Sequence, residues 1–343
     1  MTPQTDSGPS ATKEPIGQRE VPSWPEFDSQ GGGGYEVDHG ELRAIATRLV
    51  VDLNELGVDI PGAFENPPFN AGNWAGAEQV SKVFRGFSDD LYCYSSDAMV
   101  ECVVAACGIG TSGETYDITD NFEWLTRQSF WNRHLADTRT WSVGQQRSSW
   151  SSRADGYQVT ASYPAAYLRV QSENLAMEHN YDGLSKEQVW DLLATGDENS
   201  MTEFSKKMNE IADDLDWLAG RLGSTAKQTH EVWRGSAAEA ARGALKKIYD
   251  GILPLAGTYS SLGSLAQVAA EEIGTAKKQF EHVVADENWF TDMFEDDDDA
   301  SAREYLKSID RRLNANVLTP FPKDVRIELP GLIGPADRIP YHV

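Results

Sequence analysis

The chain has 343 residues, 40% of them hydrophobic, which suffices for one large domain or two modest ones. Its formal net charge of -24 repels the phosphates of nucleic acids and of anionic membranes, so neither is expected as a partner. No apolar run reaches the roughly 20 residues of a membrane-spanning helix, and the polar segment Met1–Ser10 is no Sec-type signal peptide, so a chain made in the cytoplasm would need a non-Sec route of export.

The first predicted segment is a disordered arm over residues 1–34. It is rich in Pro, Gly, Ser and Gln and ends in four consecutive glycines. Such a composition buries too little apolar surface to fold alone, so we expect a flexible segment.

A first helical hairpin is predicted over residues 35–121. Its short first helix is followed by a Pro/Gly-rich loop over residues 57–73. The second helix begins after Trp74 and is expected to end near Cys107, because the glycines within Gly108–Gly113 oppose helix propagation. The two apolar stripes are Leu42, Ile45, Leu49, Leu53 and Leu56, and Val80, Phe84, Phe87, Leu91, Tyr94 and Ala98.

All three cysteines, Cys93, Cys102 and Cys107, lie in that second helix. An odd number of cysteines in one helix does not make a disulfide framework, and no CxxC spacing for zinc occurs. We interpret the three side chains as small buried apolar groups.

Residues 122–180 are interpreted as a Trp-rich linker without an assignable function. Tryptophans stand among Ser and Arg residues there. Apolar and polar residues alternate from Tyr157 to Tyr163, which indicates a short strand.

A second, longer hairpin is predicted over residues 181–286. One apolar stripe runs over residues 204–222 and another over residues 241–283, and every step is three or four residues. Strands have a period of two, so only helices fit this pattern. Helices of about 30 and about 50 residues would span roughly 45 Å and 75 Å. A short turn that contains Trp233 and Gly235 joins them.

Residues 287–343 are expected to form an acidic loop, a short helix and a Pro-rich tail. The run Asp296–Asp299 lacks the Gly and the closing Glu of a calcium-binding loop, so a solvated loop is expected. The prolines after Asn316 predict an extended, non-helical tail.

Two short motifs stand at the predicted helix ends. Trp-x-Gly occurs at Trp74–Gly76 and at Trp233–Gly235, each time directly before an amphipathic helix. Gly permits a tight turn, and the indole can pack over that turn with its N–H free for a partner. Tyr-x-x-x-Asp occurs once, at Tyr116 and Asp120, after the second helix of the first hairpin. Purely structural roles remain the alternative: a Trp that staples the turn, and an ordinary polar helix end.

Together these features resemble the WXG family and its PE and PPE relatives, which are helical hairpins exported by type VII (ESX) secretion systems. Residues 35–121 match the order of a small WXG hairpin, and Glu231–Ala238 resembles the turn of a PPE-like partner. The resemblance implies two hairpins, elsewhere separate chains, that are fused here through residues 122–180.

The resemblance further implies a non-enzymatic protein that is secreted or held in the cell envelope. Its implied partners are the type VII translocase ATPase and, beyond that, an export chaperone, another WXG-family chain or a second copy of itself. A composite export signal would place the tyrosine motif of one hairpin beside the turn of the other. The residues implied for secretion signalling or partner binding are Tyr116, Asp120, Trp233, Gly235, Trp74 and Gly76.

The expected fold is all-α: an elongated helical bundle of two antiparallel hairpins with disordered termini, packed through their apolar stripes. No cofactor, metal or catalytic residue is predicted. Two alternatives stay open. One is an intracellular helical scaffold. The other is a dinucleotide-binding enzyme that uses the GxGxxG pattern of Gly108–Gly113, which requires a strand, a Gly turn and a helix in succession.

Overall fold

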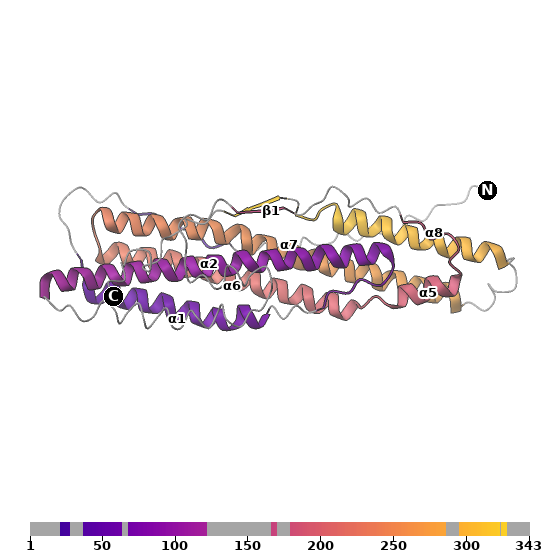
Figure 1. Ribbon diagram of the computed structural model, residues 1–343, viewed down its shortest axis with the longest axis horizontal. Helices are drawn as coiled ribbons and strands as arrows, with labels where there is room; N and C mark the ends of the chain where they lie inside the picture. The colour runs from indigo at the N-terminus through magenta and orange to yellow at the C-terminus, as the bar shows by residue number, and fades with distance from the viewer. Residues whose placement is uncertain are drawn as a thin grey trace, which may run out of the picture.

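In the computed structural model the chain is a long bundle whose helices run close to one common axis (Figure 1). The structure describes residues 21–27, 37–63, 68–121, 166–169, 179–285, 295–322 and 324–327. The all-α prediction is confirmed, and the described part adds a two-stranded antiparallel ribbon. Within these ranges, no helix combines the length and hydropathy that a membrane crossing requires.

The longer hairpin consists of α6 (Glu198–Val232) and α7 (Ser236–Ala285). Their lengths of 35 and 50 residues agree with the prediction. The predicted stripe of α6 is buried throughout, and so is the stripe of α7 from Leu245 to Phe280. The carboxylate of Asp197 caps α6 by accepting two backbone N–H bonds of the first turn, each 3.1 Å long.

The shorter hairpin consists of α1 (His39–Ala63) and α2 (Ala75–Asn121), and both helices run further than predicted. α1 continues into the expected Pro/Gly loop, and α2 does not end near Cys107 but passes through Gly108–Gly113. Each helical glycine costs about 0.5–1 kcal/mol relative to alanine, and the buried side chain of Ile109 in the same stretch offsets that cost. A continuous helix is not the strand, turn and helix of a dinucleotide site, so that alternative loses its structural basis.

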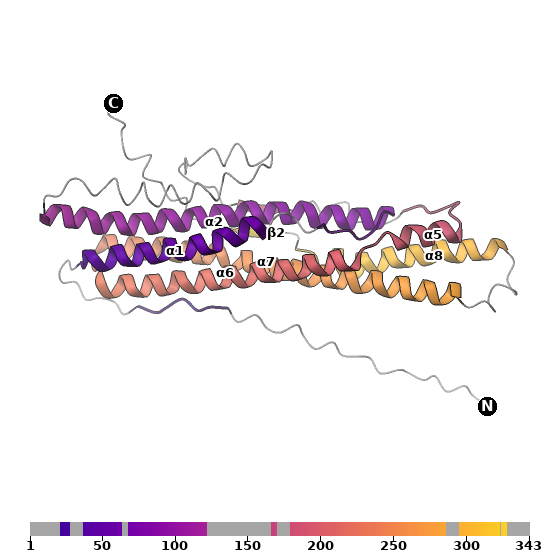
Figure 2. The same cartoon turned by 90° about the horizontal axis from the view of Figure 1, so that it is seen from below.

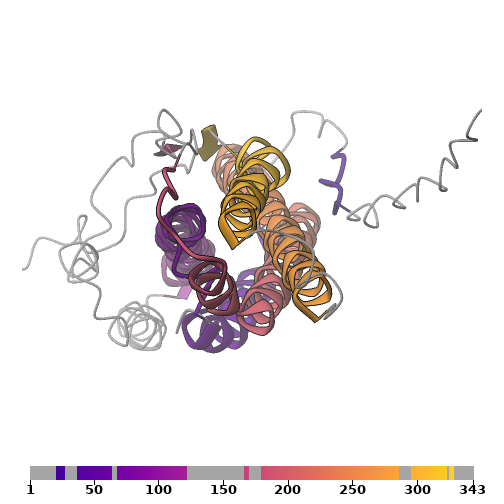
Figure 3. The same cartoon turned by 90° about the vertical axis from the view of Figure 1, so that its right-hand side faces the viewer.

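The two hairpins dock antiparallel, with their turns at opposite ends of the bundle (Figures 1 and 2). Figure 3, a view along the bundle, shows the helices packed side by side. α1 packs on α6, and α2 packs on α7. The stacked rings of Phe69 and Phe84 lie 4.1 Å apart, and Phe204 meets Phe69 edge-on at 5.1 Å. These rings join the two hairpins in one hydrophobic core.

α5 (Lys186–Ala194) and α8 (Glu295–Leu313) pack on the remaining length of α7. The sequence predicted that the acidic run Asp296–Asp299 is a loop. In the structure this run forms the start of α8. The N-terminus of a helix carries partial positive charge, so carboxylates stabilise it. The acidic run therefore stands at the N-terminus of α8, where its charge stabilises the helix.

The C-terminal tail is less extended than predicted. The chain passes through a π-helical turn, η2 (Asn314–Leu318), and then buries Phe321 in the core. Only afterwards does it form β2 (Asp324–Ile327), which pairs antiparallel with β1 (Ala166–Arg169). The strand predicted over residues 157–163 and most of the Trp-rich linker lie outside the described residues.

Residues 21–27 belong to the folded bundle, in contrast to the disordered arm predicted for residues 1–34. Trp24 and Phe27 are half-buried and pack against the main core. Figure 2 shows this segment running beside α6. The rest of the predicted arm, like the last residues of the chain, lies outside the described residues.

Candidate functional site

The start of α1 and the α6–α7 turn form one end of the bundle, which we call the turn end (Val37–Arg43 and Glu231–Gly235). Val37 forms an isolated antiparallel bridge with Trp233. The backbone N–H of Asp38 donates to the Val232 carbonyl at 2.9 Å. The Asp38 carboxylate then caps α1 by accepting the Glu41 backbone N–H at 3.0 Å. This short pairing fixes the beginning of one hairpin on the turn of the other.

The last turns of α2 lie at the same end of the bundle (Figure 1). They contain Tyr116 and Asp120, whose side chains are outside the described residues. The sequence predicted that the tyrosine motif follows the helix. In the structure the motif is part of α2. The helix directions are those that a composite signal requires, while a side-chain contact between the motif and the turn stays a prediction.

Trp233 anchors the turn from inside the core. Its side chain is 1% exposed. Its backbone N–H donates to the Thr229 carbonyl at 3.0 Å, and its carbonyl accepts from Arg242 at 3.4 Å. The family resemblance had implied a role for Trp233 in secretion signalling or partner binding. In the structure the ring faces inward, and the exposed side chain of the turn is Arg234.

Gly235 gives the turn its shape, because its φ of 109° lies in the left-handed region that side chains rarely adopt. Gly235→Ala is expected to lower the free energy of unfolding by about 1–3 kcal/mol through backbone strain. Gly243→Ala is the matched control on α7, where an added Cβ meets no heavy atom within 4 Å. This control should raise stability by about 0.5–1 kcal/mol. Urea unfolding measures both, and equal effects would show that the turn does not need glycine.

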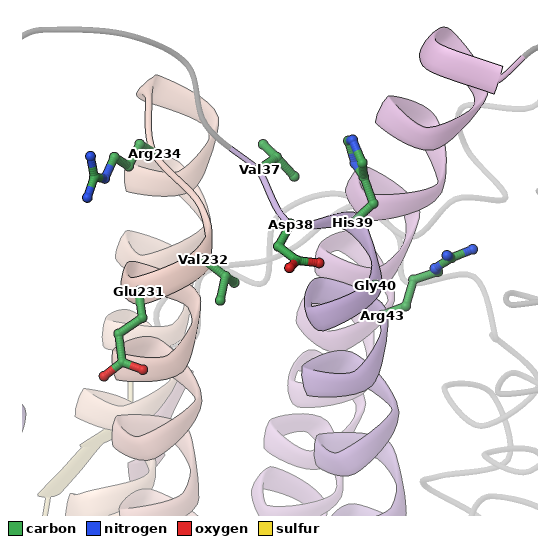
Figure 4. Close-up of a pocket in the computed structure, with 8 residues that line it drawn as sticks. All are labelled: Val37, Asp38, His39, Gly40, Arg43, Glu231, Val232 and Arg234. Carbon is green, nitrogen blue, oxygen red and sulfur yellow. The ribbon is translucent and has the colours of Figure 1, made fainter.

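A hollow of about 580 Å³ opens at the turn end (Figure 4). Figure 4 shows the Asp38 carboxylate between the two helices, with Arg43 and Glu231 pointing away on opposite sides. The charged groups diverge, so no general base and nucleophile face one another. The lining residues are Val37, Asp38, His39, Gly40, Arg43, Glu231, Val232 and Arg234.

The first Trp-x-Gly motif is built into the core at the other turn. Trp74 is 1% exposed, and its indole N–H donates to Asp310 Oδ1 at 2.9 Å. The Tyr181 hydroxyl donates to Asp310 Oδ2 at 2.5 Å. A Cβ on Gly76 would lie 2.1 Å from Asp310 Oδ1. The indole N–H that was predicted to be free for a partner is satisfied internally, and Gly76 makes room for the carboxylate.

This Asp310 cluster (Trp74, Gly76, Tyr181 and Asp310) joins segments 236 and 129 residues apart in the sequence. Burial raises the pKa of Asp310 above its ordinary value of 3.8, although the hydrogen bonds from Tyr181 and Trp74 act in the opposite direction. Burial and the neighbouring Asp310 raise the pKa of Tyr181, so its hydroxyl stays protonated and remains a donor. The cluster is a structural latch between α2, α8 and the segment before α5.

Sequence reasoning missed Asp310 and Tyr181. A signal for Asp310 was present, because it shares one helix face with Leu306 and Leu313, four residues before it and three after it. A charged residue on an apolar stripe is rarely buried without a partner. Its partners come from distant segments, so the sequence alone could not name them.

The described ranges contain no group of three or more His, Cys, Asp or Glu that could hold a metal ion. Cys102 is buried, and that burial raises the pKa of its thiol. This agrees with its interpretation as a small buried apolar group. The side chains of Cys93 and Cys107 lie outside the described residues.

Comparison with known proteins places a family domain on the longer hairpin. Residues 181–288 match the family model of the WXG100 like domain, a range that contains α5, α6 and α7. Among solved structures, EspB from Mycobacterium marinum is similar, with 14% sequence identity and a TM-score of 0.45. That similarity covers 86% of this chain and 100% of that one. No curated protein matches the sequence.

Proposed function

We propose that this chain, whose residues 181–288 form a WXG100-like domain, is exported as a folded bundle by a type VII secretion system. The observation that carries the proposal is the coincidence of that domain with the α6–α7 hairpin and its Trp233–Gly235 turn. The first hairpin adds the helix that carries the tyrosine motif, because α2 ends at the turn end, beside the Trp233–Gly235 turn of the second hairpin (Figure 1). The exported protein would be secreted or held in the cell envelope.

The export signal in this proposal is composite. α2 contributes Tyr116 and Asp120, one helical turn apart. The turn contributes the exposed Arg234, while the buried Trp233 and the glycine Gly235 hold its shape. An aromatic ring and a guanidinium are groups enriched in protein interfaces, and a carboxylate adds charge complementarity that favours one partner over others. Because the two parts come from different hairpins, only the folded bundle would present the whole signal.

The proposal assigns the chain no catalytic role. An export chaperone or a second WXG-family chain is the further partner that the family resemblance implies. We assign such a partner to the turn end, where Asp38, Glu231 and Arg234 are exposed.

Tyr116→Ala is expected to lower the exported fraction by about tenfold or more, which corresponds to a loss of about 1.4 kcal/mol in recognition. Tyr116→Phe is the matched control, because it keeps the ring and should be exported nearly as well as the wild type. Immunoblots of supernatant and cell pellet measure export in a host with an active type VII system, and circular dichroism checks folding. Wild-type export of a folded Tyr116→Ala variant would remove the motif from the signal.

A further inference from the structure

The segment Val21–Phe27, which we call the N-terminal strap, lies in a seat formed by α6 and α7. Two glycines of α6 leave notches for its prolines. A Cβ on Gly223 would lie 3.3 Å from Pro25 Cδ, and a Cβ on Gly220 would lie 3.9 Å from Pro22 Cβ. Glycines at these positions allow the extended strap to approach the helix backbone closely.

Aromatic side chains of the strap contact rings on both helices of the seat. Trp24 packs against Tyr249 with ring centroids 5.1 Å apart, and Phe27 packs against His230 at 5.0 Å. The Tyr249 hydroxyl donates to the backbone carbonyl of Pro22. The strap is therefore recognised through its backbone as well as its side chains.

Two cationic side chains of α7 lie against the aromatic rings of the strap, and one of them, Lys246, also forms an ion pair with Asp250. The Arg242 guanidinium lies 5.7 Å from the Phe27 ring centre, and the Lys246 ammonium lies 5.7 Å from that of Trp24. Shape and aromatic contacts thus match the strap together.

We propose that the groove between α6 and α7 is a docking site for an extended peptide with the pattern Trp-Pro-x-Phe, and that the N-terminal strap is its resident occupant. Only residues 28–36 separate the strap from Val37 on the start of α1. A tether this short gives the strap an effective concentration on the order of millimolar. A partner segment of the same chemistry therefore binds only when the strap leaves. This docking site is independent of the export route.

The test uses full-length protein and a fluorescent peptide with the sequence of residues 19–29. The strap variant Trp24→Ala/Phe27→Ala is expected to bind the peptide saturably and at least about tenfold more tightly than the wild type, which competes in cis. Adding Gly223→Leu to the strap variant fills the Pro25 notch and should abolish binding, while leucine keeps the helix stable. Fluorescence anisotropy measures all three proteins, and circular dichroism confirms that each is folded.

Equal binding by the strap variant and the wild type, or binding by neither, would overturn the proposal. Limited proteolysis supplies a second readout that does not depend on the peptide. Chymotrypsin is expected to cut after Phe27 in Gly223→Leu and to spare that bond in the wild type. If Gly223→Leu is as well protected as the wild type, the notch does not seat the strap and the proposal fails.

Discussion

Asp310→Ala is expected to lower the free energy of unfolding by about 2–6 kcal/mol. The substitution removes the acceptor of two buried donors, the Trp74 indole and the Tyr181 hydroxyl. A buried donor left without a partner costs about 1–3 kcal/mol. Urea unfolding followed by far-UV circular dichroism measures the loss. A loss below about 1 kcal/mol would show that the cluster is not a latch.

Asp310→Asn is the matched control, because it keeps the shape of the side chain and one carbonyl acceptor but cannot titrate. Burial holds the pKa of Asp310 in the folded state above its ordinary value of 3.8. The folded protein therefore takes up a proton at a higher pH than the unfolded chain does, and this gains stability as pH falls. Relative to Asp310→Asn, the wild type should gain stability from pH 7 down to about pH 4 and lose it again as pH rises. The opposite slope would mean that the hydrogen bonds outweigh burial.

Trp233→Ala is expected to destabilise the bundle by about 3–5 kcal/mol, the usual cost of deleting a fully buried large aromatic side chain. The indole is 1% exposed, and the residue joins the α6–α7 turn to Val37 through a backbone bridge. The loss should therefore loosen both the turn and the start of α1. Because the proposed export signal needs a folded turn, export of this variant should fall together with its melting temperature.

Trp217→Ala is the matched control for Trp233→Ala, because Trp217 also belongs to the second hairpin but is 43% exposed. A surface substitution of this kind usually changes stability by less than about 0.5 kcal/mol. Thermal unfolding and export are measured for both variants. If Trp233→Ala melts like the wild type but is not exported, the indole contacts the export machinery directly, and the anchoring role assigned to it is wrong.

The longer hairpin could be predicted because its apolar spacing of three and four residues repeats over many turns, so that local and tertiary preferences agree. The sequence analysis predicted too early an end for α2. The glycines at positions 108–113 disfavour a helix locally, whereas burial of neighbours such as Ile109 favours one. The acidic run at the start of α8 was misread for a similar reason. Charge indicated solvent, and the favourable position of carboxylates at a helix N-terminus was not weighed.

The candidate site was predictable in outline and not in detail. The order of motifs placed Tyr116, Asp120 and the Trp233–Gly235 turn in two hairpins, and antiparallel docking brings the end of α2 to the turn end. Burial of both motif tryptophans could not be predicted, because it depends on partners far away in the sequence, such as Asp310 for Trp74. The N-terminal strap was not predicted, because the Pro, Gly, Ser and Gln content of residues 1–34 indicated disorder, and the two aromatic residues Trp24 and Phe27 were given no weight.

Dependence of export on the translocase ATPase tests the central claim most directly. The full-length chain is expressed in two strains that differ only in the activity of the type VII ATPase, with a cytosolic protein as the control for lysis. The account predicts uncleaved protein of 37.9 kDa in the supernatant of the strain with the active ATPase and none in that of the other. Equal amounts in both supernatants, or retention inside the cells of both strains, would contradict it.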